Sequence, residues 1–156
     1  MILIETINQF NFTRGYTYGR LKQSSDTEWD TQPKGYNNTI RWNVGHIFVF
    51  METFTHLAIP KYEAVHPEWI PLFTTGSSPA SWKGKIPSNE ELRTALEEQS
   101  TRLERVFKGG LDSTIPEPIT IRPHKMETVE AVLQFIIWHE GIHAGMIDGL
   151  NRATAK

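Results

Sequence analysis

The sequence predicts an all-α fold, a four-helix bundle with long crossover connections. Four segments repeat apolar residues at the spacing of a helix, and two long linkers interrupt them. A chain of 156 residues can bury one hydrophobic core, so we expect a single domain over residues 1–156.

The first two helices are predicted from apolar periodicity and from their end signals. The first runs from about Leu3 to Gln23, and Arg14 replaces an apolar residue on its inner face. The second follows Thr39, a favourable N-cap, and ends before Pro60. The inner face of the first helix comprises Leu3, Ile7, Phe10, Thr17 and Leu21, and that of the second comprises Trp42, His46, Val49, Phe50, Thr53 and Leu57.

The third and fourth helices are predicted in the same way. Ser88 and Glu91 form a capping box, and the third helix continues to Lys108 with Gln99 on its apolar face. The fourth runs from about Thr128 to Arg152. Its predicted inner face comprises Ala131, Phe135, His139, Ile142 and Met146.

Two linkers complete the chain. Residues 59–87 hold five of the nine prolines and four large aromatic residues, so we expect an ordered crossover over one end of the bundle rather than disorder. Residues 109–127 form the second linker, in which Ile119 to Arg122 is a candidate for a short strand.

Composition narrows the classes of function. The net charge of −2 gives no electrostatic signature for nucleic acid or an anionic membrane, and no apolar run is long enough to span a bilayer. The N-terminus lacks the features of a signal peptide, so a soluble cytoplasmic protein is expected. Because the chain has no cysteine, a transition metal would be bound through nitrogen and oxygen.

The segment WHEGIH contains H-E-x-x-H, the zinc motif of many metalloproteases, in which His139 and His143 point the same way from one helix. A protease needs a third ligand further along the chain, but the thirteen residues after His143 contain no Glu and no His. Asp148 lies about 140° around the helix from His143, so it points away from the two histidines and cannot be the third ligand. A di-iron site is also disfavoured. It requires a second helix with E-x-x-H, and the only other match, Glu63 to His66, lies in the proline-rich linker. A peptidase and a di-iron protein are therefore both disfavoured.

The third ligand must then come from upstream, where His46 is the best placed. It lies on the core face of the second helix, whereas His56 lies about 80° around that helix and His66 and His124 lie in linkers. Three buried imidazoles would be costly without a metal, whereas three histidines around one ion form a familiar catalytic zinc site. The predicted ligands are His46, His139 and His143.

The same residues carry a resemblance to a known family. The pattern Trp29-x-x-Gln32-Pro33, Thr39-Ile40-x-Trp42-x-x-x-His46-Ile47 and, after the crossover, Thr128, Leu133 and His139-Glu140-x-x-His143-x-Gly145-x-Ile147 is similar to the DinB-like (damage-inducible) superfamily. The resemblance covers essentially the whole chain. It implies an up-down-down-up four-helix bundle, one divalent ion held by His46, His139 and His143, and a homodimer. Members with assigned chemistry are mostly transferases or isomerases that use bacillithiol, mycothiol or glutathione, and others are described as metal-dependent hydrolases.

Three hypotheses for the function follow. The first is an enzyme that transfers a low-molecular-weight thiol to a small electrophile, with a divalent ion that lowers the pKa of the thiol. The second is a hydrolase that activates water, in which Glu140 is a candidate base or, alternatively, a carboxylate that orients a histidine. The third is a non-catalytic metal-binding bundle. Zinc or nickel is favoured as the ion and iron is compatible.

Three further residues are candidates for a substrate pocket. Trp42 lies one turn before His46, and Arg14 and Gln99 are polar residues on core faces that need partners. The alternative interpretations are that Arg14 extends its charged end to solvent, that Gln99 lies at the edge of its apolar face, and that Trp42 packs in the core. The expected partner is a small-molecule substrate, with neither nucleic acid nor membrane involved.

Overall fold

The computed structural model describes residues 2–155, and side chains from Ile4 onward. Met1 and Lys156, at the ends of the predicted domain, and the side chain of Leu3 therefore lie outside the described residues. The main elements are α1 (Ile2–Lys22), α2 (Ile40–Ala58), α3 (Ile70–Phe73), α4 (Asn89–Lys108), β1 (Thr114–Ile121), β2 (His124–Thr128) and α5 (Val129–Thr154). Short 3-10 turns occupy Asp26–Glu28, Pro67–Trp69 and Pro79–Ser81.

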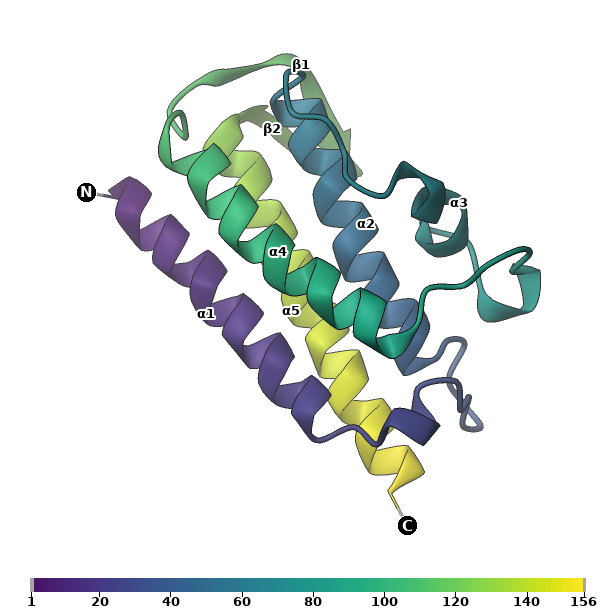
Figure 1. Ribbon diagram of the computed structural model, residues 1–156. Helices are drawn as coiled ribbons and strands as arrows, with labels where there is room; N and C mark the ends of the chain where they lie inside the picture. The colour runs from purple at the N-terminus through teal and green to yellow at the C-terminus, as the bar shows by residue number, and fades with distance from the viewer. Residues whose placement is uncertain (1, 156) are drawn as a thin grey trace.

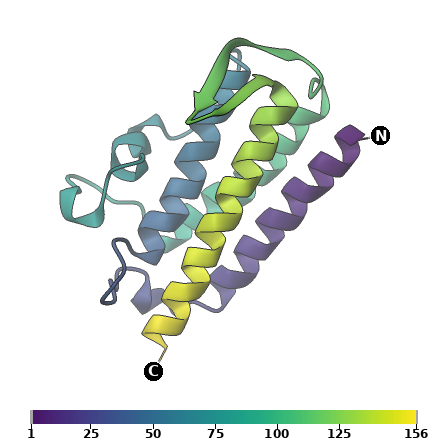
Figure 2. The same cartoon turned by 180° about the vertical axis from the view of Figure 1, so that it is seen from behind.

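The long helices α1, α2, α4 and α5 lie side by side (Figure 1). Helix α5 packs along α1 on one side and along α2 on the other, and α4 contacts both α1 and α2. Figure 2 shows α5 from behind, between α1 and α2. The fold is thus mostly helical, as predicted.

The second linker adds a small sheet to the predicted helical fold. Residues Thr114–Ile121 and His124–Thr128 form a two-stranded antiparallel sheet, with Ile121 opposite His124 and Thr114 opposite Thr128. The short strand expected at Ile119–Arg122 is one part of this hairpin. Ile115 and Met126 turn inward and are buried, which anchors the hairpin over one end of the helices.

The helix ends agree closely with prediction because their signals are local. The side chain of Thr39 accepts a hydrogen bond from the Trp42 N–H, and Ser88 and Glu91 form the expected capping box. Thr128 caps α5 in the same manner, by accepting from the Ala131 N–H. Local polar groups thus define where three of the long helices begin.

The inner face of α1 is as predicted, whereas that of α5 is not. Ile7, Phe10, Thr17 and Leu21 are buried, but Ile142 and Met146 are 44% and 39% exposed. The buried side of α5 is rotated away from the predicted face and includes Leu133, Ile136, Ala144, Ile147 and Leu150. Leu57, predicted to face the core from α2, is also exposed. The stripe through His139 therefore borders the solvent and is not the centre of the core.

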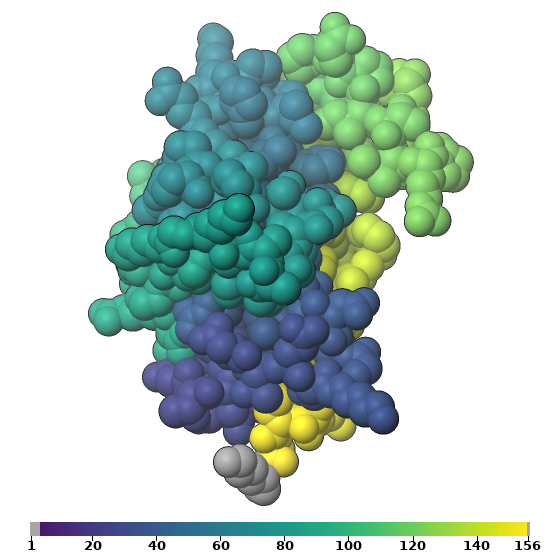
Figure 3. All heavy atoms as spheres, turned by 90° about the vertical axis from the view of Figure 1, so that its right-hand side faces the viewer, coloured from purple at the N-terminus to yellow at the C-terminus, as the bar shows by residue number. Residues whose placement is uncertain are grey.

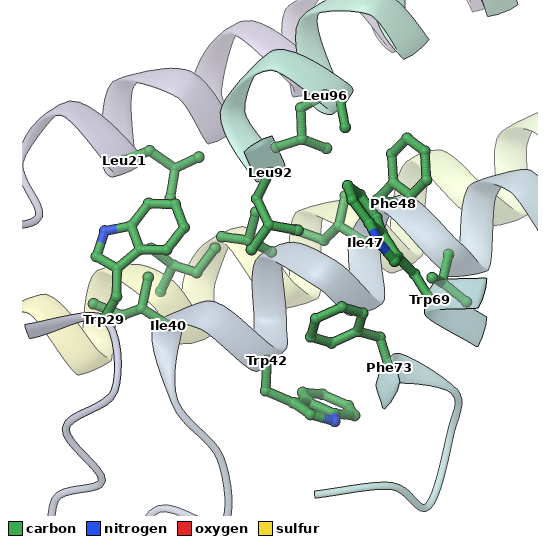
Figure 4. Close-up of a cluster of buried hydrophobic side chains, with 14 of the residues drawn as sticks. Leu21, Trp29, Ile40, Trp42, Ile47, Phe48, Trp69, Phe73, Leu92 and Leu96 are labelled. Atoms are coloured by element: carbon green, nitrogen blue, oxygen red, sulfur yellow. The ribbon is translucent and has the colours of Figure 1, made fainter. Parts of the chain in front are cut away.

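The core consists of two apolar clusters. One surrounds Trp29, Phe48, Phe73 and Leu96 and is shown in Figure 4, with Trp29 beside Leu21 and Phe73 beside Trp42. The other lies toward the hairpin and includes Phe10, Met51, Leu103, Phe107, Met126 and Val132. The crossover over residues 59–87 is ordered, as expected, and buries Tyr62, Trp69 and Phe73. None of the described helices is long and apolar enough to cross a membrane.

Candidate metal centre

The three predicted histidines meet between α2 and α5. His46 comes from α2, and His139 and His143 come from consecutive turns of α5. One ring nitrogen from each lies within 4.8 Å of the others, a spacing at which all three can bind one ion. Within residues 2–155 no other group of three His, Asp or Glu side chains converges in this way. We call His46, His139 and His143 the triad.

Hydrogen bonds fix how two members of the triad are oriented. The Nδ1–H of His46 donates to the carbonyl oxygen of Phe73 at 2.6 Å. His143 Nδ1 lies 2.8 Å from Asn43 Oδ1, and the Asn43 amide is oriented because its Nδ2 donates to the Thr39 carbonyl. Since a carbonyl oxygen can only accept, both histidines carry their proton on Nδ1 and present the lone pair of Nε2 to the centre of the triad.

The third member, His139, completes the convergence. Its Nε2 lies 3.0 Å from His46 Nε2. His46 presents a lone pair there, so neutral His139 donates its Nε2–H to His46 unless its proton lies on Nδ1, in which case the Nε2 lone pairs of the two rings face one another. A cation at this point would satisfy the lone pairs of all three rings. The residues therefore fit a divalent metal ion.

Burial keeps the triad neutral. It lowers the pKa of His139 to about 2, with further contributions from the neighbouring His143 and His46. It lowers the pKa of His143 to about 4, again assisted by His46, and it also lowers the pKa of His46, which the hydrogen bond to Phe73 partly opposes. Only a neutral imidazole has a free lone pair, so all three are in the form that binds a metal at pH 7.

Aromatic rings enclose the triad on two sides. Trp42 stacks on His46 with ring centroids 4.5 Å apart, and its indole N–H donates to Ser77 in the crossover. Phe50 stacks on His139 at 3.5 Å. The rings limit the approach of water from these sides, while His139 and His143 remain partly exposed. Trp42, one turn before His46 in α2, thus packs against the triad.

Arg14, Gln99 and Glu140 lie in a different cluster. The Arg14 guanidinium contacts both carboxylate oxygens of Glu140, at 2.8 and 3.2 Å, and also the Gln99 side chain at 2.8 Å. Thr17 donates a further hydrogen bond to Glu140 at 2.7 Å. Arg14, Gln99 and Glu140 are almost completely buried. The carboxylate of Glu140 is therefore fully occupied by α1 and does not face the triad.

The cluster extends across the bundle. The amide of Gln99 donates to Glu52 at 2.9 Å, and Glu52 also accepts from Tyr62 and Arg102. Arg14, Glu52, Gln99 and Glu140 come from α1, α2, α4 and α5, one residue from each long helix. We call these four residues the polar layer.

Several residues of the site were not predicted from the sequence. Asn43 orients His143, and the Phe73 carbonyl orients His46, but neither an amide near a histidine nor a main-chain oxygen in a linker is a recognisable signal. Glu52 could have been found, because it is a charged residue within the apolar run FVFMETF. The other three histidines make contacts away from the triad. His56 contacts the Tyr62 carbonyl, His66 stacks on Trp69, and His124 stacks on Phe135.

Comparisons with known proteins agree with this architecture. A family model described as the DinB superfamily matches residues 9–147. Among solved structures, a conserved protein from Enterococcus faecalis superposes with a TM-score of 0.70 at 12% sequence identity, over 98% of this chain and 96% of that one. At that identity the likeness concerns the fold alone. No curated protein sequence matches the chain.

Proposed function

The chain belongs to the DinB superfamily, and we propose that it is a metal-dependent enzyme that transfers a low-molecular-weight thiol, such as bacillithiol, to a small electrophilic substrate. The observation that carries the proposal is the triad, in which three neutral imidazoles converge within 4.8 Å beside a partly exposed surface. The chain has no cysteine, so the reacting sulfur would have to arrive with a thiol cofactor.

In this proposal the triad holds one divalent ion. A bound ion would supply Lewis acidity and lower the pKa of a coordinated thiol. The ligands are neutral nitrogens, which suit zinc or nickel and also permit iron. Asn43 and the Phe73 carbonyl would keep the rings in the ligating tautomer, and Trp42 and Phe50 would restrict water around them.

A metal-dependent hydrolase is the alternative, and the surroundings of Glu140 disfavour it. A hydrolase needs a base to take a proton from water, and Glu140 was the candidate. Its carboxylate already accepts hydrogen bonds from Arg14 and Thr17 in the buried polar layer. A non-catalytic bundle is disfavoured for another reason, because His139 and His143 are accessible from solvent whereas structural metal sites are closed.

A thiol-transfer assay tests the proposal. Zinc- or nickel-loaded protein is mixed with bacillithiol or glutathione and with the electrophile monochlorobimane, and adduct formation is followed by fluorescence. We expect a rate above the uncatalysed one that disappears on chelation and in His46→Ala, His139→Ala and His143→Ala. His56→Ala is the matched control and should retain full activity, because His56 is exposed and contacts the Tyr62 carbonyl rather than the triad. Turnover of an ester without any thiol would favour the hydrolase instead.

We propose two finer features of the architecture. The first is an up-down-down-up four-helix bundle, which is supported by the common direction of α1 and α5 and the opposite direction of α2 and α4 in Figure 1. The second is cytoplasmic action, where low-molecular-weight thiols are kept reduced. An experimental structure and fractionation of the source cells test these two points.

We also propose a homodimer, supported by exposed apolar side chains on α1. Ile4, Phe12 and Tyr16 are 66%, 68% and 45% exposed, and their spacing places them on one side of the helix. Sedimentation of the 17.9 kDa chain should give twice that mass at micromolar concentration, and Phe12→Ser should shift it to the monomer. A wild-type monomer would remove the proposal.

A further inference from the structure

A groove of about 700 Å³ lies between the β1–β2 turn and α5. Its walls include Ile121, Arg122, His124, Phe135 and Trp138. Phe135 precedes the ligand His139 by four residues, and side chains at this spacing are neighbours on one face of a helix. The groove therefore begins one helical turn from the triad. Figure 3 shows the hairpin standing out beside α5, with a hollow between them.

The groove offers flat aromatic surface to solvent. Trp138 is 58% exposed, although it is among the largest apolar side chains of the protein. Phe135 lies between Trp138, at 5.4 Å, and the stacked ring of His124, at 5.8 Å. Exposed aromatic rings that line a concave surface are typical of ligand sites, because a flat ligand can stack on them.

Arg122 gives the groove a cation held in an unusual backbone conformation. Ile121 pairs with His124, so Arg122 and Pro123 form a two-residue hairpin turn. Arg122 has φ of +53°, a value normally adopted by glycine at this position of a type II′ turn, whereas proline keeps φ negative at the next. Strain of this kind persists where the surrounding structure or the function requires it.

The Arg122 guanidinium also has no ionic partner within the described part of the chain. The acidic group of the same hairpin that makes an ion pair is Glu127, and it contacts Lys125. An arginine without a counter-charge beside aromatic rings is suited to bind a carboxylate through two parallel hydrogen bonds. The groove thus combines an apolar floor with one cation at its rim.

We infer that this groove binds a flat, apolar carboxylate, with its ring system on Phe135 and Trp138 and its anionic group on Arg122. The inference rests on the proposed function, for which it names the class of substrate: an aromatic anion bound one helical turn from the triad. Phe50 lies between the two sites, because it stacks on His139 and contacts Phe135 with ring centroids 6.0 Å apart. A ligand lying along Phe135 would therefore end against Phe50, the ring that covers one side of His139.

Binding of 2-naphthoate to the zinc-loaded full chain tests the inference, with the uncharged 2-naphthamide as the matched probe. Calorimetry gives the affinity, and the indole N–H signal of Trp138, assigned with Trp138→Phe, reports the location by NMR. Arg122→Gly removes the charge and permits the positive φ, so it should raise the melting temperature while weakening naphthoate about fivefold. Arg122→Lys keeps the charge but cannot donate two parallel hydrogen bonds, so it should retain only part of the affinity. Arg105→Gln, an exposed arginine of α4, is the control and should change neither value.

The outcomes separate this inference from the proposed function. Naphthoate binding that shifts Trp138 and falls in Arg122→Gly, with naphthamide affinity unchanged, supports the groove. Persistence of this binding in His46→Ala supports it even if thiol transfer is never observed. Equal naphthoate affinity in wild type and Arg122→Gly, or no shift at Trp138, overturns it. So does binding that disappears as the protein dimerises, because a second chain would then occupy the groove.

Discussion

Gly45 allows the crossover to approach α2 closely enough to hold His46. A Cβ added at Gly45 would lie 2.3 Å from the ring of Phe73, and Phe73 is fully buried, so the ring has little room to move. The same Phe73 supplies the carbonyl that accepts the Nδ1–H of His46. A residue with no functional group is thus part of the support of the candidate metal centre.

We expect Gly45→Ala to weaken both folding and metal binding. Displacement of Phe73 should lower the free energy of unfolding by about 1–3 kcal/mol, the usual cost of overpacking a core. Loss of the carbonyl partner should reduce zinc affinity roughly tenfold or more. Calorimetric zinc titration and thermal unfolding measure the two effects.

Gly15→Ala provides the control for this substitution. Gly15 lies in α1 with nothing within 4 Å of an added Cβ, so alanine there should stabilise the helix slightly and leave zinc affinity unchanged. If Gly45→Ala bound zinc as tightly as wild type, the Phe73 carbonyl would not be a determinant of the site.

The candidate metal ligands could be predicted from the sequence, whereas the groups that orient their rings could not. His139 and His143 share a helix at a fixed spacing, and His46 follows from the face of α2 on which it lies. Asn43 and the Phe73 carbonyl reach the rings only after the helices and the crossover have packed together. Contacts of this second kind depend on tertiary structure, for which a single sequence gives no local pattern.

A helix or strand could be predicted from the sequence where the contacts that define its ends lie within a few residues of each other. The starts of α2, α4 and α5 were predicted because each cap bonds within three residues. The hairpin was largely missed because its turn, Arg122-Pro123, lacks the Asn-Gly or Gly-containing pair that signals a hairpin, and because its register is irregular between Thr114 and Ile119. The inner face of α5 was misplaced because apolar residues surround much of this helix, so periodicity alone does not identify the side that packs.

The capping box of α4 should make a contribution to stability that depends on pH. Glu91 accepts hydrogen bonds from the Ser88 N–H and from Lys85, and these lower its pKa to about 2 from an ordinary value near 4.5. A lowered carboxylate pKa stabilises the folded state above the unfolded-state pKa, and this contribution declines as pH falls from about 4.5 toward 2. We expect Glu91→Gln to be less stable than wild type at pH 7, and the difference to shrink at pH 3.5.

Urea unfolding at the two pH values measures this difference. Glu90→Gln is the matched control, because Glu90 is exposed on the same helical turn and is not a member of the capping box. A constant difference between Glu91→Gln and wild type from pH 7 to 3.5 would mean that the carboxylate charge is not what the cap uses.

The polar layer joins the four long helices at one level of the core. Although burial by itself opposes the charge of Arg14, the Glu140 carboxylate raises the pKa of Arg14, so Arg14 remains charged. Glu140 is adjacent in sequence to the ligand His139. The ion pair therefore fixes the rotation of α5 relative to α1 and, with it, the direction in which His139 projects.

Removal of one partner of this buried pair should be strongly destabilising. Arg14→Met leaves the Glu140 charge buried without compensation, and we expect a loss of about 3–5 kcal/mol in the free energy of unfolding. The double substitution Arg14→Met with Glu140→Leu should recover a large part of that loss, because no uncompensated charge remains.

Chemical denaturation of the single and double variants makes the comparison. Arg20→Met breaks a more exposed pair between the same two helices, with Asp148, and should cost less than about 1 kcal/mol. A double variant no more stable than Arg14→Met would show that the layer acts through shape or hydrogen bonding rather than through charge.

For the whole molecule, the triad links two helices that are otherwise held by apolar packing and by the polar layer. His46 comes from α2, between the crossover and the core, whereas His139 and His143 come from α5. An ion bound to all three would therefore connect the N-terminal and C-terminal halves of the chain. The unfolded chain cannot present the three rings together, so metal binding should appear as global stability.

We expect one zinc or nickel ion per chain to raise the melting temperature of the entire protein. A ligand that binds only the folded state stabilises it by RT ln(1 + [L]/Kd), or roughly 4 kcal/mol at a free concentration a thousandfold above Kd. Thermal unfolding with metal and after chelation measures the gap, and native mass spectrometry counts the ions. The gap should disappear in His46→Ala, because two imidazoles remain, and persist in His56→Ala, since His56 lies outside the triad. Two ions per chain would show that the chain has a metal site other than the triad. A gap lost in His56→Ala but kept in His46→Ala would place the metal at the opposite end of α2.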